Sequence, residues 1–371
     1  MPNKPRILHV GIHNSLNHNA GDTLLFPVVR KTFEHFLGPV EWELCQAWEP
    51  FTLEDAQRVN EFFDGLVLGG GGLLLRDQAG SDSTRSGWQW NCETAAVNAL
   101  DIPLFTFAIG YNRFRGQPEF DSIFTENIRA LVAKSSFFSL RNNGSIESLK
   151  RYLSGSQSSK LCRQFCPTTI IWQLFPEYRR DSLNHYGKNK KVLSVNAAFD
   201  RINLRIPHFS DHYLNQFALS LKSACDNGWE ILLTLHKKVD QQIEPFLRAE
   251  GIRYKIIDLT QSTPNQIMAF YAEVDAVVGM RGHSQMIPFG LRKPIFSIIS
   301  HDKMKFFLDD IGHPEWGEEI TSPELNSKII GFLSALECAR DDMNASISCA
   351  QESVFCETVK NFDSIRRVLS L

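Results

Sequence analysis

Residues 276–284 of the chain read AVVGMRGHS, and this stretch decides how the second half of the sequence folds. A short apolar strand, Ala276–Gly279, is followed by a polar turn, and a helix begins near His283. Such a strand–turn–helix unit is typical of α/β domains, in which helices return the chain between parallel strands. The stretch therefore predicts an α/β domain around it.

The alternation continues on both sides of this stretch. We expect strands at residues 192–196, 230–235, 253–258 and 294–299, helices at 210–227, 240–250 and 263–272, and two closing helices at about 322–339 and 341–371. The strands are continuous apolar runs, which is typical of a parallel sheet that helices cover on both faces.

The first half of the chain shows the same pattern. Strands are expected at residues 7–11, 41–47, 65–68, 103–109 and 137–140, and helices at 23–36, 52–63, 94–99, 120–133 and 145–153. Thr52 is the expected N-cap of its helix, with Asp55 at the third helical position. The charged and polar stretch 176–191 is typical of a linker between two domains.

Together these patterns predict an α/β fold of two Rossmann-like, doubly wound domains that face a cleft. The first domain is expected at residues 1–178 and the second at residues 190–340, followed by a C-terminal helix at residues 341–371. In doubly wound sheets ligands bind beyond the carboxyl ends of the strands. The expected site is therefore the cleft between the two domains.

The composition excludes several classes of protein. The formal net charge of -3 provides no basic field that could hold nucleic acid. No apolar run approaches the roughly 20 residues that span a bilayer, and no signal-peptide pattern is found, so we expect a cytoplasmic protein without a transmembrane segment. None of the eight cysteines forms a CxxC pair, which gives no support to zinc-ribbon or thioredoxin-like sites.

Four consecutive glycines, Gly69 to Gly72, follow the strand expected at 65–68. Glycines at such a turn let backbone amides approach a phosphate or carboxylate closely, so Gly70, Gly71 and Gly72 are candidate cleft residues. The dinucleotide fingerprint GxGxxG fails because Leu74 stands at its third glycine position. The alternative is a tight turn between a strand and a helix that contacts no ligand.

A polar segment, residues 17–22 (NHNAGD), follows the first strand and precedes a helix. Asp22 is either the N-cap of that helix or a general base or ligand of a sugar hydroxyl. Asn17 and Asn19 are candidates to bind hydroxyls or phosphate.

The turn after Gly279 carries the strongest candidate site. Arg281 offers a rigid fork for a phosphate or carboxylate, and the amides of Gly282 and Ser284 lie at the start of a helix, where anions bind. His283 is the side chain best suited to donate a proton near neutral pH. The alternative gives Arg281 and His283 a structural role in a hydrogen-bond network between the domains.

Further polar residues follow the expected strands and share one edge of each sheet. They are Arg141, Asn196, His236 and Lys303, each with a solvated or structural role as the alternative. Trp88, Trp90, Tyr111 and Asn112 are expected in loops near the cleft. Aromatic faces there stack on sugars or, as the alternative, cap the loops.

At these motifs the sequence resembles the polysaccharide pyruvyltransferase family. The matching segments occur in the family's order: NHNAGD at 17–22, VLGGGGLL at 67–74, FAIGYN at 107–112, FSLRNNGSIESL at 138–149, and MRGHSQMIPFGLRKPIFSII at 280–299 followed by Lys303. The chain departs from the family at Asn142, where aspartate is common, at Gly282, where leucine is frequent, and at Asn196, where arginine is frequent.

The resemblance implies a fold like that of the GT-B glycosyltransferases, phosphoenolpyruvate as donor, and formation of a ketal on two sugar hydroxyls in exopolysaccharide or cell-surface glycan biosynthesis. It places Arg281 and His283 at the donor. We then expect His283 as the acid and Asp22 as the base. Donor contacts would come from Arg281, Gly282, Ser284, Arg141, Lys303, Asn196 and His236, and acceptor contacts from Asn17, Asn19, Gly70, Gly71, Gly72, Tyr111 and Asn112. No metal or obligatory cofactor is expected.

The resemblance also implies that residues 341–371 pack back on the first domain. The acceptor sugar can be lipid-linked, which would bring the cytoplasmic protein to the inner membrane face. Two other functions remain open: a nucleotide-sugar glycosyltransferase of the same fold, and a non-catalytic glycan-binding relative.

Overall fold

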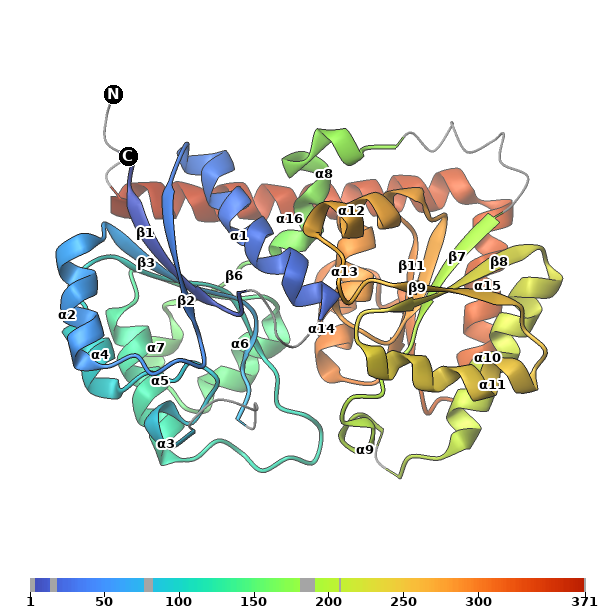
Figure 1. Ribbon diagram of the computed structural model, residues 1–371, viewed down its shortest axis with the longest axis horizontal. Coiled ribbons are helices and arrows are strands. Elements are labelled where there is room, and N and C mark those ends of the chain that lie inside the picture. Colours follow the sequence, from blue (N-terminus) through green and yellow to red (C-terminus); the bar gives the residue numbers. More distant parts are fainter. Residues whose placement is uncertain (1–3, 14–18, 77–82, 181–190, 207, 370–371) are drawn as a thin grey trace.

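The computed structural model describes residues 4–13, 19–76, 83–180, 191–206 and 208–369. It contains two parallel six-stranded sheets, each covered by helices on both faces (Figure 1). The expected fold class, two doubly wound α/β domains, is confirmed.

The first domain contains one sheet and the helices around it. Its strands are β1 (Arg6–Gly11), β2 (Glu41–Gln46), β3 (Gly65–Leu74), β4 (Leu104–Tyr111), β5 (Phe137–Leu140) and β6 (Leu161–Arg163). The helices are α1 (Ala20–Leu37), α2 (Leu53–Phe62), α3 (Ser83–Ser86), α4 (Thr94–Ala99), α5 (Ser122–Lys134), α6 (Asn143–Lys150) and α7 (Gly155–Ser158). The order β2-β1-β3-β4-β5-β6 reverses direction between β1 and β3, which is where such sheets bind ligands.

The crossover to the second domain contains the 3-10 turns η1 (Pro167–Ile170) and η2 (Pro176–Tyr178) and the helix α8 (Ile171–Leu174). Residues 181–190, which complete the expected linker, lie outside the described residues, so the predicted domain boundary stays a prediction.

The second domain repeats the architecture. Its strands are β7 (Lys191–Asn196), β8 (Trp229–Leu235), β9 (Tyr254–Asp258), β10 (Ala276–Gly279), β11 (Ile295–Ile299) and β12 (Gly317–Glu319). The helices are α9 (Ile202–Arg205), α10 (Asp211–Asp226), η4 (Lys238–Ile243), α11 (Glu244–Ala249), α12 (Pro264–Glu273), α13 (His283–Gly290), α14 (Asp302–Asp310), η5 (Pro314–Trp316) and α15 (Leu325–Cys338). The order β12-β11-β10-β7-β8-β9 is that of a Rossmann domain, with its reversal between β7 and β10.

The last helix, α16 (Arg340–Leu369), runs along both domains (Figure 1). Its Phe362 stacks on Phe36 of α1, with 4.5 Å between the ring centroids. Arg366 donates a hydrogen bond to the Phe36 carbonyl, with 3.0 Å between Nε and O. The helix that begins beside the second domain therefore ends packed on the first.

One hydrophobic core extends across both domains. It joins residues of the first sheet and α1 to residues of α12, α13, α14 and α16, for example Leu25, Ile287 and Ile347. A large apolar interface of this kind restrains relative movement of domains. The two domains that form the cleft are thus joined by a continuous hydrophobic core.

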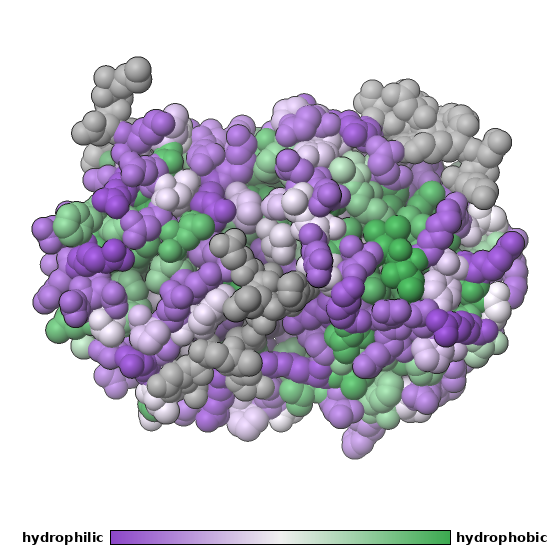
Figure 2. All heavy atoms as spheres, viewed as in Figure 1, coloured by the Kyte–Doolittle hydropathy of each residue, from purple (hydrophilic) through white to green (hydrophobic). Residues whose placement is uncertain are grey.

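The surface is mixed in polarity (Figure 2). Hydrophobic residues gather over the second domain in this view. The edge strand β9 leaves Ile256 40% exposed. No helix among the described residues is long and apolar enough to cross a membrane.

Several short elements were not predicted: the strands β6 and β12 and the helices α3, α7, α8, α9 and α14. The strand β12 has the sequence GEE and contains no apolar residue, and β6 is three residues long. The helix α14 follows β11 directly and was read only as a polar strand end at Lys303. In contrast, the capping box of Thr52 and Asp55 at α2 is confirmed.

The glycine run is not the turn that the sequence predicted. All four glycines belong to β3, which is six residues longer at its carboxyl end than the predicted strand 65–68. Gly69, Gly70 and Gly71 have positive φ angles of 134°, 50° and 87°, a region that side-chain-bearing residues rarely adopt. A Cβ on Gly70 would lie 3.1 Å from Leu25, so the run lets β3 bend closely beneath α1.

Candidate active site

A cavity of about 290 Å³ lies between the domains, beyond the carboxyl ends of both sheets. Residues after β1 and β3 line its first-domain wall, and residues after β7 and β10 line its second-domain wall, so it joins the two points where strand order reverses. Its lining consists of Ile12, Asn19, Asp22, Gly72, Leu75, Gln89, Asn112, Phe114, Arg141, Asp200, Arg201, Arg205, His236, Lys237, Arg281, Gly282, His283, Met286 and Lys303.

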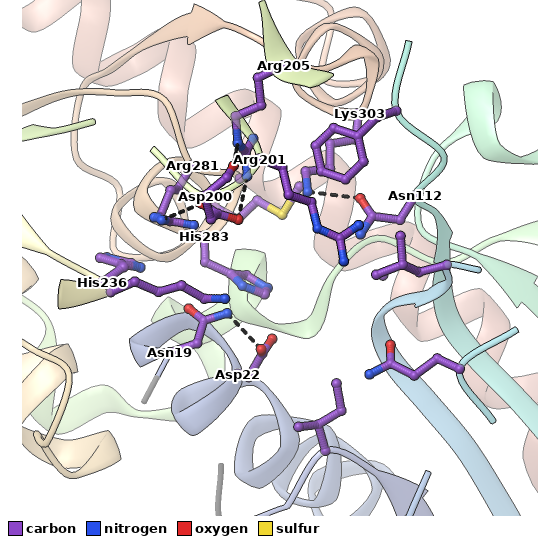
Figure 3. Close-up of a pocket in the computed structure, with 18 of the residues that line it drawn as sticks. Asn19, Asp22, Asn112, Asp200, Arg201, Arg205, His236, Arg281, His283 and Lys303 are labelled. Atoms are coloured by element: carbon purple, nitrogen blue, oxygen red, sulfur yellow. Dashed lines mark hydrogen bonds and ion pairs between the residues drawn. The ribbon is translucent and has the colours of Figure 1, made fainter. Parts of the chain in front are cut away.

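The charges of this lining are unbalanced. Six cationic side chains, Arg141, Arg201, Arg205, Lys237, Arg281 and Lys303, face two carboxylates, Asp22 and Asp200. Figure 3 shows Arg201, Arg205, Arg281 and Lys303 on one side of the cavity and Asn19 and Asp22 across from them. The cavity is therefore suited to an anionic ligand.

Arg141 is the most exceptional of these cations. It follows β5, is 5% exposed, and its Nε and Nη2 atoms have no hydrogen-bond partner among the described residues. The guanidinium fits because residue 110 is glycine, where a Cβ would overlap the Arg141 side chain. Burial lowers its pKa, yet arginine stays charged in proteins. Arg141 thus presents a buried charge to the cavity, with two nitrogens that no hydrogen bond to the described residues satisfies and with Asp22 as the carboxylate that favours its charged form.

Lys303 lies at the start of α14 beside this arginine. Its Nζ donates a hydrogen bond to Asn112 Oδ1 at 3.0 Å. Burial and then the charges of Arg141 and Arg205 hold the pKa of Lys303 well below its usual range. An anion placed between these groups would reverse that shift, because it favours the charged ammonium.

Arg281 was predicted to bind a phosphate or carboxylate of a ligand, but its guanidinium binds carboxylates of the protein. Its Nε donates to Asp240 Oδ2 at 2.8 Å, its Nη2 also bonds Asp240, and an ion pair of 2.6 Å joins it to Asp200. The fork predicted to hold a phosphate is therefore occupied by protein carboxylates. This hydrogen-bond network lies within the second domain, whereas the structural alternative placed it between the domains.

His283 begins α13 and touches the first domain. Its Nε2 lies 3.7 Å from Cys166 Sγ, and a Cβ on Gly21 of α1 would overlap its ring. Burial, followed by the charge of Arg141, lowers the pKa of His283 well below its usual value. Without a bound anion the imidazole is therefore neutral at pH 7.

Asp22 is not the N-cap of α1. The cap is Asn19, whose side chain accepts from Gly21 N at 3.2 Å and donates to Asp22 Oδ2 at 2.7 Å. Asp22 instead occupies the first turn and lines the cavity. Burial raises its pKa, which makes the carboxylate a stronger base than an exposed aspartate.

Several predicted site residues lie outside this cavity. Asn196 donates to Thr234 O at 2.8 Å, Ser284 Oγ donates to Arg281 O at 2.8 Å, and the Tyr111 hydroxyl lies 3.2 Å from that of Tyr152. The others are Gly70 and Gly71, which lie under α1, and Trp88 and Trp90, which are fully buried. Asn17 lies outside the described residues.

The remaining predicted residues do line the cavity: Gly72, Asn112, Gly282 and His236. His236 Nε2 lies 2.6 Å from the Tyr271 hydroxyl, while its buried Nδ1 has no partner in the described part of the chain. Burial lowers the pKa of His236 to about 3, so its ring is neutral.

Sequence reasoning missed Phe114, Asp200, Arg201, Arg205 and Lys237. Asp200 to Arg205 follow the strand β7, so the rule that polar strand-end residues gather at the site would have reached them if extended past Asn196. Among the described residues, no group of three or more His, Cys, Asp or Glu side chains is arranged to hold a metal ion.

Comparisons with known proteins agree with this fold. A family model described as polysaccharide pyruvyl transferase matches residues 19–302. A UDP-GlcNAc 2-epimerase from Neisseria meningitidis, solved with UDP-GlcNAc, has a TM-score of 0.52 at 13% identity and covers 96% of this chain and 100% of its own. The UDP-GlcNAc 2-epimerase from Methanocaldococcus jannaschii has a TM-score of 0.52 at 11% identity, covering 89% of this chain and 92% of its own. No curated protein matches the sequence.

Proposed function

The chain belongs to the polysaccharide pyruvyl transferase family, and from this premise we propose that it moves the pyruvyl group of phosphoenolpyruvate onto two hydroxyls of a sugar. The products would be a cyclic ketal and phosphate. The expected pathway is exopolysaccharide or cell-surface glycan biosynthesis.

The observation that carries the proposal is the unpartnered guanidinium of Arg141 beside Lys303. A buried charge without a partner is costly unless a ligand compensates it. Phosphoenolpyruvate is small and carries a phosphate and a carboxylate, which suits a cavity with four more cations than carboxylates among its lining residues. At about 290 Å³, the cavity is near the lower end of ligand pockets, roughly 300–1,000 Å³.

The reaction requires a proton on the methylene carbon of the donor. Protonation makes the adjacent carbon electrophilic, a sugar hydroxyl attacks it, phosphate departs, and a second hydroxyl closes the ketal. The two hydroxyls lose two protons in total. One of these protons matches the proton that is added to the new methyl group. The other ends on the released phosphate.

His283 is the proposed acid. Its pKa lies well below the usual value in the protein alone, but the donor's negative charges would raise that pKa, so that the ring takes up a proton when the donor binds. The same binding event therefore charges the acid and places the methylene carbon in the cavity.

Asp22 is the proposed base on the opposite wall. Its carboxylate is oriented by Asn19 at 2.7 Å, and its raised pKa favours removal of a hydroxyl proton. The acceptor sugar would lie along the first-domain wall, near Asn19, Gly72 and Leu75. A lipid-linked acceptor would present the sugar at the inner membrane face. No step of this mechanism uses a metal or another cofactor.

A transfer assay tests this function. The protein is incubated with phosphoenolpyruvate and a panel of sugars, and both released phosphate and the mass of the sugars are measured. We expect phosphate release that depends on one sugar, which gains one pyruvyl ketal. Transfer from a UDP-sugar in the same panel, with phosphoenolpyruvate untouched, would instead establish a nucleotide-sugar glycosyltransferase.

A further inference from the structure

A buried cysteine lies behind the proposed acid, His283, and has no part in the mechanism above. Cys166 directly precedes η1 in the crossover between the domains and is 3% exposed. Its Sγ lies 3.7 Å from His283 Nε2, a distance at which sulfur forms a weak hydrogen bond. Burial raises the pKa of the Cys166 thiol, so the group keeps its proton near neutral pH and can donate it.

Thr168 determines the direction of this hydrogen bond. Its side chain is fully buried, and its Oγ1 lies 3.1 Å from Cys166 Sγ, the partner that the hydroxyl has among the described residues. A buried hydroxyl that donates to no acceptor costs free energy, so the Thr168 hydroxyl donates to Sγ. The thiol hydrogen is then directed at His283 Nε2, which accepts it.

The direction of the hydrogen bond fixes the tautomer of the neutral His283 ring. A neutral imidazole has one donor and one acceptor nitrogen, and the bond made by one nitrogen decides which of them carries the proton. Because Nε2 accepts from the thiol, the ring proton lies on Nδ1. Nδ1 faces the first turn of α1, since a Cβ on Gly21 would lie 2.3 Å from it, and the next residue, Asp22, lines the cavity.

Close packing at both ends of α13 holds the ring in this orientation. At the start of the helix, Gly21 leaves room for the His283 ring. At its end, a Cβ on Gly290 would overlap the Thr168 carbonyl oxygen. In a closely packed interior a side chain held from both sides has little freedom to turn. The contact between Nε2 and Cys166 therefore follows from the seating of the whole helix.

We propose that Cys166, oriented by Thr168, is a positioning residue for His283: its thiol binds Nε2 and keeps on Nδ1 the proton that the acid delivers. This role rests on the proposed function. In the donor complex the protonated ring passes its Nδ1 proton to the methylene carbon of phosphoenolpyruvate. The electron pair of the carbon–carbon double bond forms the new C–H bond, and the pair of the broken N–H bond stays on Nδ1.

The thiol serves both protonation states of the ring, because sulfur can accept as well as donate. The proton that His283 takes up with the donor is added to Nε2, and this new N–H points at Cys166 Sγ. After the transfer the ring is neutral again, and its remaining proton lies on Nε2 beside the thiol. The thiol itself contacts only the ring, so it acts through His283 and not on the donor.

Nitrogen-15 NMR of the histidine rings tests the position of the proton in the protein without ligand. The shifts of Nδ1 and Nε2 distinguish the two tautomers, and His283→Gln identifies the His283 signals by their loss. Cys166→Ala removes the donor to Nε2, and Cys166→Ser restores one. Cys92→Ala is the matched control, because Cys92 is also buried but its Sγ donates to Glu93 O at 3.4 Å. Thermal unfolding checks that each variant is folded.

We expect the His283 proton on Nδ1 in wild type, Cys166→Ser and Cys92→Ala, and a rise of the Nε2–H tautomer in Cys166→Ala. In the transfer assay Cys166→Ala should lower kcat roughly tenfold, the rate equivalent of one lost hydrogen bond. The KM for phosphoenolpyruvate should change by less than about twofold, because the thiol does not bind the donor. Cys166→Ser should recover most of kcat.

The proposal is overturned if wild type carries the neutral proton on Nε2, a result that needs no cysteine variant. It is also overturned if Cys166→Ala has the ring signals or the kcat of wild type, or if serine restores neither. Failure of the proposed function looks different. In that case the tautomer of His283 depends on Cys166 as expected, but wild type transfers nothing from phosphoenolpyruvate.

Discussion

Arg141 and Arg281 each follow a strand end and face the same cavity, but only Arg281 has carboxylate partners. Replacing Arg141 by methionine removes a buried charge whose Nε and Nη2 have no hydrogen-bond partner among the described residues. We expect Arg141→Met to leave the free energy of unfolding without ligand unchanged or higher, and to abolish stabilisation by phosphoenolpyruvate. Urea denaturation with and without the donor measures both effects.

Arg281→Met is the matched control for this prediction. It leaves the fully buried Asp240 without its charged partner, so we expect a loss of about 3 kcal/mol or more in the free energy of unfolding. If Arg141→Met proves as destabilising as Arg281→Met, Arg141 is a structural residue and its role at the donor is wrong.

Binding of the donor should take up protons. Burial and neighbouring cations lower the pKa of Lys303 and of His283, and a bound anion raises both. Between the free-state and bound-state pKa values binding is coupled to protonation, so affinity should fall as the pH rises above neutral. Titration calorimetry in buffers of different ionisation enthalpy measures the uptake.

Lys303→Arg measures how much of the proton uptake is due to Lys303, because arginine is already charged before an anion binds. This variant should take up fewer protons than wild type. Equal uptake in both proteins would assign the proton elsewhere.

At the scale of elements, the starts of α1 and α13 are in close contact at the site. A Cβ on Gly21 would overlap the His283 ring. Helix propensity alone predicts that Gly→Ala stabilises a helix by about 1 kcal/mol, whereas the structure predicts that Gly21→Ala destabilises the protein and displaces His283. We therefore expect Gly21→Ala to lower both the midpoint of thermal unfolding and the rate of transfer.

Gly331 of α15 provides the comparison. A Cβ there would meet no atom within 4 Å, so Gly331→Ala should stabilise the protein by about 0.5–1 kcal/mol and leave transfer unchanged. Stabilisation by both substitutions would mean that α1 and α13 are further apart than the structure has them.

Elements with strong local patterns could be predicted from sequence, and those without could not. The apolar runs at β7, β8 and β10 and the cap at Thr52 are local signals. The glycine run was predicted to be a turn, but it forms a strand that passes beneath Leu25 and Val29 of α1. This contact depends on a helix earlier in the chain, so the run alone does not indicate it. Arg281 was assigned to the ligand because its partner Asp240, 41 residues away, becomes its neighbour only in the folded sheet.

At the scale of the whole molecule, four buried histidines and the half-buried His283 make stability depend on pH. They are His9, His13, His236, His283 and His301, and burial lowers the pKa of each, to about 4 for His13 and about 3 for His236. The unfolded chain binds these protons below about pH 6.5, while the folded protein does not. Stability is therefore full above that pH and is lost as the pH falls through 6.5 toward the folded values.

Urea midpoints at pH 7.5 and pH 5.5 measure this effect. Each histidine contributes up to about 1.4 kcal/mol per pH unit, so we expect a marked loss at the lower pH. A midpoint that does not change would show that these rings are already charged in the folded protein.

The two-domain architecture and the position of the cleft followed from the alternation of strands and helices alone. The cations on the wall of the second domain could not be predicted in this way. The helix α9 is only four residues long, and Phe114, which contacts Arg201 and Arg205, comes from the other domain. Residues brought together by two domains leave no spacing pattern in the sequence.

The most direct test of the donor is thermal unfolding with phosphoenolpyruvate beside UDP and GDP, in wild type and in Arg141→Met. A ligand at a hundredfold excess over its Kd stabilises the folded protein by about 2.7 kcal/mol. We expect a higher unfolding temperature with phosphoenolpyruvate alone, and no such increase in Arg141→Met. An increase with UDP or GDP alone, or an equal increase with phosphoenolpyruvate in both proteins, would contradict this expectation.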